Sequence, residues 1–175
     1  MSWILAHHAH KSLSKEEATE IYRLTREIMQ KENISGVPLI IKSGVWKTAY
    51  RYKKTPISPP LYKIEESIQL GSRMLTGSLL PSSIYYISLY DPDYKIYSIK
   101  SPRHIMMATI VASIILEEIA HCINRRANSW NKRTSPHGVE FLSVFRELWK
   151  KYFIILQFKL QNIYGSEGDI GEKSR

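Results

Sequence analysis

Apolar residues recur at helical spacing near the start of the chain and again along two long stretches near its end. In the first stretch they fall on one helix face, three or four positions apart: Ala18, Ile21, Leu24 and Ile28. Ser14 lies just before this run and Glu17 follows Ser14 by three positions, which is the capping-box pattern of a helix N-terminus. The sequence therefore predicts an amphipathic helix that runs from Ser14 to about Gln30 and packs on a sheet.

Short extended patterns separated by turn residues fill the middle of the chain. The expected strands are Val37–Lys42, Val45–Lys53, Gly71–Thr76, Ser83–Leu89 and Tyr94–Ile99. Three prolines within Thr55–Leu61 indicate a linker or a surface excursion, and Tyr62–Leu70 fits either a short helix or an irregular arm. Together these segments predict a small, mostly antiparallel sheet.

Two long helices are predicted in the second half of the chain. Ser101-Pro102 is a favourable start for the first, with serine as the N-cap and proline at the first helical position. A polar loop, Asn128–Ser135, separates it from the second helix. The expected bounds are Ser101 to about Asn124 or Arg126 for the first helix, and His137 or Val139 to Tyr164 for the second.

The expected fold class is α+β, with an N-terminal helix, a small mostly antiparallel sheet and two long C-terminal helices. At 175 residues the chain has the length of one domain. We assign that domain to residues 1–164, and we expect the polar, glycine-containing residues 165–175 to be disordered.

The chain is basic and has one cysteine. Its 25 lysines and arginines exceed its 16 aspartates and glutamates, and the formal net charge of +9 favours anionic partners such as nucleic acid. Cys122 cannot form an intramolecular disulfide and fits a reducing compartment, and we expect a buried, inert thiol. The longest apolar run, Ile105–Leu116, is too short to cross a bilayer. We therefore expect an intracellular protein, cytoplasmic or nucleoid-associated, with no membrane partner.

Two adjacent carboxylates and a histidine follow the apolar part of the first long helix. Glu117 and His121 are four positions apart, so on a helix they point the same way, one turn apart. His137 comes sixteen residues after His121, which leaves room for a loop and a return to the same site. Burying such carboxylates is costly unless a cation or hydrogen-bond donors receive them. The pattern therefore indicates a metal site formed by Glu117, His121 and His137, with Glu118 beside it as a candidate general base.

The stretch Leu116–His121, followed by His137-Gly138 and Phe141, resembles the H-E-x-x-H and H-G-x-x-F motifs of the SprT-like zinc metallopeptidases. The chain departs from the family pattern at one position, because Glu117 stands where the family has its first metal-binding histidine. The similarity extends in a weaker form over roughly Val37–Trp149, through Arg73-Met74, Gly77 and Ile84–Leu89.

This resemblance implies a hydrolase that cuts peptide bonds in a single SprT-like domain. It implies that Glu117, His121 and His137 hold zinc, or manganese or iron in its place. Glu118 would then be the catalytic base that takes a proton from the metal-bound water. The family acts on proteins associated with DNA, so the implied partners are a protein substrate and nucleic acid.

The alternative is a catalytically inactive scaffold of the same fold that binds no metal and holds nucleic acid or a protein. The segment Trp46–Lys54 interleaves aromatic and basic side chains, which single-strand binding requires. An edge strand with a solvated lysine fringe is the simpler interpretation of the same residues. The segment Arg125–Arg133 would supply further cations to such a surface: Arg125, Arg126, Lys132 and Arg133.

Overall fold

The computed structural model describes residues 13–45, 47–75, 103–127 and 137–165, and it confirms the predicted α+β class. The described elements are the helices α1 (Lys15–Lys31), α2 (Ser72–Leu75), α4 (Arg103–Ala127) and α5 (Val139–Gly165), and the strands β1 (Leu39–Lys42), β2 (Ala49–Ser58) and β3 (Leu61–Gly71).

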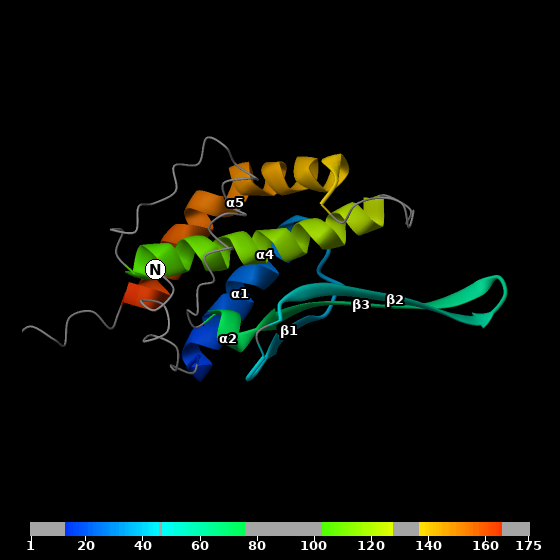
Figure 1. Cartoon of the computed structure of the whole chain (residues 1–175), viewed down its shortest axis with the longest axis horizontal. Helices are drawn as coiled ribbons and strands as arrows, with labels where there is room; N and C mark the ends of the chain where they lie inside the picture. The colour runs from blue at the N-terminus through cyan, green and yellow to red at the C-terminus, as the bar shows by residue number, and fades with distance from the viewer. Residues whose placement is uncertain (1–12, 46, 76–102, 128–136, 166–175) are drawn as a thin grey trace, which may run out of the picture.

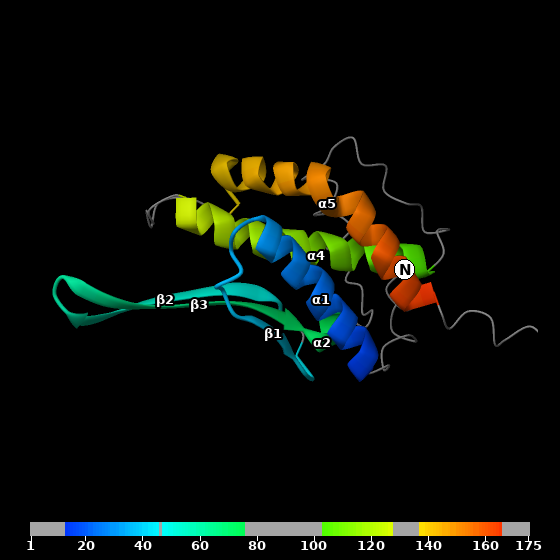
Figure 2. The ribbon, with the colours of Figure 1, turned by 180° about the vertical axis from the view of Figure 1, so that it is seen from behind.

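The described elements form layers, with the sheet at one side and α5 at the other (Figure 1). Helices α1 and α4 lie against the sheet, and α5 packs along α4 on the side away from it. Seen from behind, α1 crosses in front of α4 and contacts both β1 and α5 (Figure 2). Helix α4 is therefore covered on both sides, and the buried apolar side chains of these elements form one core.

Helix α1 begins with the predicted capping box. The Ser14 hydroxyl accepts a hydrogen bond from the Glu17 backbone N–H at 3.1 Å, and the Glu17 carboxylate accepts one from the Ser14 N–H at 2.8 Å. The predicted apolar face is buried, with Ile21, Leu24 and Ile28 in the core. At the other end the Tyr152 hydroxyl of α5 donates to Glu32 at 2.6 Å, which ties α5 to the end of α1.

The sheet is mixed, with the strand order β1-β3-β2. Strand β3 pairs with β2 in antiparallel fashion along most of its length and with β1 in parallel fashion over a shorter stretch. The turn after β1 contains Gly44, whose φ of +70° favours glycine, and its N–H donates to the Ser72 hydroxyl at 2.9 Å. Because β3 lies between them, β1 and β2 follow each other in the chain without being neighbours in the sheet.

The interpretation of Thr55–Leu61 as a linker and of Tyr62–Leu70 as a helix or irregular arm is wrong. Both belong to a long hairpin of β2 and β3 that extends beyond the helices (Figure 1). Pro56 is tolerated because β2 lies at the edge of the sheet that the described strands form, where a proline need not break a ladder of hydrogen bonds. The strand period was visible in the sequence, since apolar residues occupy alternate positions: Tyr62, Ile64, Ile68 and Leu70.

The predicted strand Gly71–Thr76 is also wrong. Strand β3 ends at Gly71, and Ser72–Leu75 form the short helix α2. The Leu75 side chain is fully buried and the Leu75 carbonyl accepts a hydrogen bond from the Tyr164 hydroxyl at 2.8 Å. Packing against the helices thus decided the conformation of this segment, whose own pattern was compatible with a strand.

Helices α4 and α5 confirm the predicted pair. The end of α4 at Ala127 lies one residue beyond the predicted Arg126, and α5, Val139–Gly165, begins at a predicted residue and ends one residue beyond the predicted Tyr164. By length and composition alone, His104–Ala127 passes as a membrane span. The helix that contains the apolar run Ile105–Leu116 is therefore long enough to cross a bilayer, although the run alone is too short. However, 78% of its most apolar window is buried inside the protein, which is the burial expected for the core helix of a soluble protein.

Several predicted features lie outside the described residues. These are the strands Ser83–Leu89 and Tyr94–Ile99, the helix start Ser101-Pro102, the polar loop Asn128–Ser135, Trp46 and the tail from 166 onward.

Replacing Ser14 by alanine removes one half of the capping box, and the Glu17 N–H loses its acceptor. We expect the free energy of unfolding to fall by about 1 kcal/mol, measured by urea denaturation followed by circular dichroism. The matched control is Ser35→Ala, an exposed serine in the turn after α1, which should leave the midpoint unchanged. Equal stability of S14A and the wild type would show that the cap contributes nothing.

Candidate metal centre

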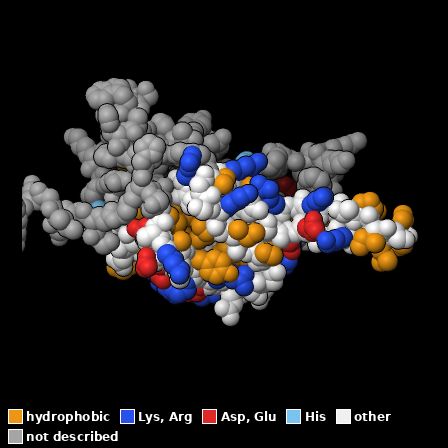
Figure 3. All heavy atoms as spheres, turned by 90° about the horizontal axis from the view of Figure 1, so that it is seen from below, with side chains coloured by type: hydrophobic (Ala, Val, Ile, Leu, Met, Phe, Trp, Pro, Cys, Tyr) orange, Lys and Arg blue, Asp and Glu red, His pale blue; other side chains and the backbone are white. Residues whose placement is uncertain are grey.

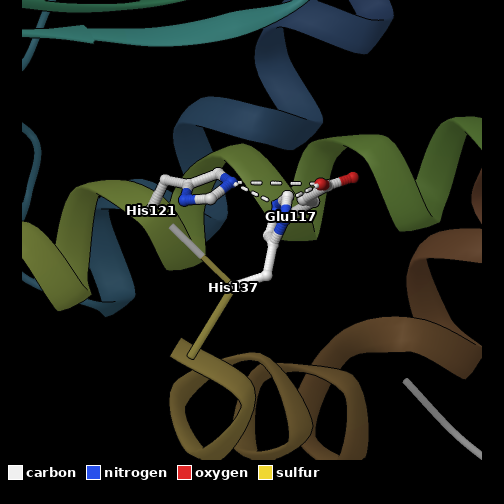
Figure 4. Close-up of side chains that lie close together, drawn as sticks. All are labelled: Glu117, His121 and His137. Atoms are coloured by element: carbon white, nitrogen blue, oxygen red, sulfur yellow. Dashed lines mark hydrogen bonds and ion pairs between the residues drawn. The ribbon is translucent and has the colours of Figure 1, made fainter. Parts of the chain in front are cut away.

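Three side chains with metal-ligand chemistry converge where α4 approaches the start of α5. Glu117 and His121 project from neighbouring turns of α4, and His137 reaches them from the residues just before α5 (Figure 4). The Nε2 atom of His137 lies 3.2 Å from Glu117 Oε1 and 3.2 Å from His121 Nε2. His121 Nε2 and Glu117 Oε1 are 3.9 Å apart. The predicted grouping of these three residues is therefore present.

The spacing of the three donor atoms fits a small cation. Ligand atoms about 2.1 Å from a tetrahedral zinc ion lie roughly 3.4 Å from each other, and the observed separations of 3.2, 3.2 and 3.9 Å are close to that value. Hydrogen bonds among the three side chains explain their close approach less well. A neutral imidazole nitrogen carries either one hydrogen or one lone pair, so Nε2 of His137 can direct a hydrogen to only one of its two close neighbours. A cation would accept electron pairs from all three atoms.

The aromatic ring of Phe141 sets the positions of both histidines. Phe141 is fully buried in the first turn of α5, stacks on His121 at 4.3 Å between ring centroids, and meets His137 edge-on at 4.9 Å. Phe145 and Trp149 continue this row along α5. Because Phe141 is part of the core, the ring faces of the two histidines rest on a rigid surface. This contact gives a physical reason for a phenylalanine four residues after His137.

Glu118 lies on a different side of α4 and faces the sheet. Its carboxylate accepts a hydrogen bond from the backbone N–H of Tyr50 in β2, and only 7% of the residue is exposed. Burial, and next the nearby charge of Glu117, raises the pKa of Glu118 to about 8, while the bond from Tyr50 lowers it in part. A carboxyl group with a pKa close to neutrality is well matched to accepting and returning protons.

A second polar cluster, which the sequence did not reveal, joins the base of the hairpin to the end of α4. The Tyr50 hydroxyl donates to Glu66 at 2.8 Å, and Arg126 forms an ion pair with the same carboxylate. The hydrogen bond from Arg126 is the main reason that the pKa of Glu66 is lowered. The cluster holds Tyr50 beside α4, where its N–H meets Glu118. It joins residues that are 16 and 60 positions apart, a separation that no local pattern signals.

The candidate nucleic-acid surface is only partly described. Lys47, Arg51, Lys53 and Lys54 of the first segment are exposed, whereas Tyr50 and Tyr52 are partly buried. In the second segment, Arg125 lies 3.9 Å over the ring of Tyr52, in addition to the ion pair that Arg126 makes. Trp46, Lys132 and Arg133 lie outside the described residues. Arg125 and Arg126 therefore contact the hairpin, and one face of Tyr52 is covered by a cation.

Cys122 is fully buried, and burial raises the pKa of its thiol to about 12. We expect a thiol-directed aromatic disulfide reagent to leave the native protein unmodified and to react with one thiol per chain in urea. Absorbance of the released thiolate measures both reactions. Fast modification of the native protein would contradict the buried, inert role.

Comparison with protein-family models, with curated proteins and with solved structures finds no match to this chain.

Proposed function

We propose that this chain is a metal-dependent peptidase of the SprT-like kind. The observation that carries the proposal is the convergence of Glu117, His121 and His137, whose donor atoms all lie within 4.8 Å of one another. The three side chains are partly exposed, with 29%, 21% and 41% of their surface accessible, respectively. These exposed fractions support access of solvent and a substrate to the three side chains.

The donor set favours zinc as the ion. Two imidazoles and one carboxylate are a combination that catalytic zinc sites use, and three protein ligands leave the fourth position to water or substrate. A carboxylate ligand also suits manganese and iron, which are the alternatives. The anionic oxygen of Glu117 lowers the charge at the ion more than a neutral histidine would. We therefore expect weaker activation of water than at a site with three histidines.

Glu118 is the proposed catalytic base. When bound, the metal ion supplies Lewis-acid polarisation of the carbonyl and of the attacking water. With the metal held by Glu117, His121 and His137, Glu118 would take up the proton of the attacking water as the C–O bond forms, and it would pass that proton to the amine nitrogen as the C–N bond breaks. Its bond from Tyr50 uses Oε2, so Oε1 is the oxygen that would handle the proton. The Tyr50 N–H would keep the carboxyl group oriented.

The sheet edge beside the site supports an extended peptide as the substrate class. Strand β2 is an edge strand, and the Tyr50 N–H points away from β3 toward α4. Successive residues of a strand alternate in direction, so the backbone groups of Tyr52 and Lys54 face the same edge, with which no strand of the described part of the chain pairs. An extended peptide can pair with such an edge by main-chain hydrogen bonds.

Metal analysis is the direct test of the site. We expect one equivalent of zinc, manganese or iron per untagged chain by mass spectrometry of the purified protein. Glu117→Ala and His137→Ala should each weaken the affinity by more than about 100-fold, because they remove a ligand, and loss of a group that merely orients a ligand already costs 10- to 100-fold.

The matched controls for these variants are Glu147→Ala and His104→Ala. Glu147 is an exposed carboxylate on α5, and His104 lies near the start of α4, about 20 Å along the helix from Glu117. Both controls should bind metal as the wild type does. Absence of metal after reconstitution, or equal loss in the controls, would contradict the site.

Glu118→Gln separates catalysis from metal binding. It keeps the side-chain shape but removes the proton acceptor, so we expect cleavage of an unfolded protein substrate to fall by roughly 10²- to 10⁴-fold with the metal content unchanged. Gel electrophoresis and peptide mass spectrometry measure the cleavage. Full activity of E118Q would contradict the role of Glu118. A metal-loaded wild type that cuts no substrate would favour the inactive scaffold.

A further inference from the structure

The end of the β2–β3 hairpin is an exposed apolar finger. This hairpin tip, residues 56–62, extends away from the helices (Figure 1), and hydrophobic side chains gather there on the surface (Figure 3). Four large apolar residues in the tip or next to it have about half or more of their surface exposed: Ile57 69%, Leu61 65%, Ile64 57% and Tyr62 49%. Water-exposed apolar side chains grouped in this way mark an interaction site rather than a folding requirement.

A collar of lysines surrounds the finger just behind the tip. Lys63 is paired across the strands with Thr55, and Thr55 lies two residues after Lys53. Because paired residues, and residues two apart in one strand, share a face, Lys53 and Lys63 point to the same face of the ribbon. Lys54, paired with Ile64, points to the opposite face. Lys63 forms an exposed ion pair with Glu65 at 2.7 Å, and such exposed pairs contribute little free energy. Glu65 lies on the same face as Lys53 and Lys63 and offsets one of their two charges, so each face of the finger keeps one net positive charge at this level.

The dimensions of the finger match the interfacial layer of a lipid bilayer. The turn at Pro59-Pro60 comes three positions after Pro56 on one strand and two positions before Tyr62 on the other, which gives the apolar end a depth of about 7–10 Å. Side chains that bind bilayers from one side are buried about 5–10 Å deep at the headgroup and acyl boundary. Prolines 56, 59 and 60 also carry no backbone N–H, which lowers the cost of removing the tip from water.

We propose that the hairpin tip binds an anionic lipid surface, with Ile57 and Leu61 inserted among the lipids and the lysine collar in contact with the phosphates. A finger that enters a bilayer end-on is surrounded by headgroups, which accounts for lysines on both faces. Tyr62, whose ring lies 4.0 Å from the Lys54 ammonium, sits at the level where aromatic side chains prefer the interface. This binding is peripheral and independent of the metal centre. It replaces the expectation of no membrane partner, which considered spanning segments only.

Other partners fit the finger less well. A ribbon in a DNA groove needs cations along its length and a short apolar wedge, whereas this finger is apolar on both faces over its outer end and has its cations behind. Stacking on single-stranded bases needs open ring faces, and cations lie over one face of both Tyr52 and Tyr62. A protein groove would account for the apolar end but not for lysines on both faces.

Vesicle sedimentation tests the proposal with the full chain. We expect the wild type to sediment with phosphatidylcholine vesicles that contain phosphatidylserine, and much less with phosphatidylcholine alone. The double variant Ile57→Ser/Leu61→Ser should weaken this binding about tenfold or more. Each of Lys53→Ala, Lys54→Ala and Lys63→Ala should weaken it by about fivefold at low salt. The matched control is Ile154→Ser/Phe158→Ser, which removes two equally exposed apolar side chains from α5 and should change nothing.

A reporter at the tip measures insertion directly. The emission of Leu61→Trp should shift to the blue and resist a water-soluble quencher with anionic vesicles, whereas Ile154→Trp should do neither. Absence of binding to anionic vesicles, or equal loss in the α5 control, would overturn the proposal. The proposal would also fail if the wild type did not bind vesicles but bound duplex DNA or self-associated, and if Ile57→Ser/Leu61→Ser abolished that binding or self-association. Metal content and peptidase activity do not enter any of these readouts.

Discussion

The burial of α4 is the constraint on which the rest of the structure depends. This helix lies between α5 and the sheet, and its apolar residues from Met107 to Ile119 form much of the core. A helix held in this way cannot rotate without exposing one buried side or the other. The directions of Glu117, Glu118 and His121 are therefore decided by packing, and each of these polar groups must find a partner at the place where the helix presents it.

The two carboxylates of α4 meet that requirement in different ways. Glu118 is directed at the sheet, where the Tyr50 N–H receives it, and its raised pKa shows that burial outweighs this single bond. Glu117 is directed at the α4–α5 side, where two imidazoles face it. A buried polar group without a hydrogen-bond partner costs about 1–3 kcal/mol of stability. A site with this arrangement gains stability when a cation binds, because the cation takes up the lone pairs that the fold has brought together.

The hairpin has two regions with different partners. Its base is joined to α4 through Glu66, Tyr50 and Arg126, while its outer end contacts none of the described helices (Figure 1). A two-stranded ribbon has little stability of its own in water, so the cluster around Glu66 supports the ribbon as well as the orientation of Glu118. The same sheet therefore contacts Glu118, beside the candidate metal centre, at one end and exposes an apolar finger at the other.

The sequence alone was sufficient for features that depend on neighbours along the chain. The capping box of α1, the end of α4, the bounds of α5, and the common direction of Glu117 and His121 follow from contacts within a few residues. The distances between the three candidate ligands, the strand order and the hairpin depended on contacts between distant segments. Thr55–Leu70 looked like a linker and an irregular arm because three prolines interrupt its first half, and the alternation of apolar residues after Tyr62 does not identify the strand with which they pair. Only the tertiary structure decided that Glu118 would face Tyr50 and that Arg126 would pair with Glu66, since these partners lie 68 and 60 residues apart.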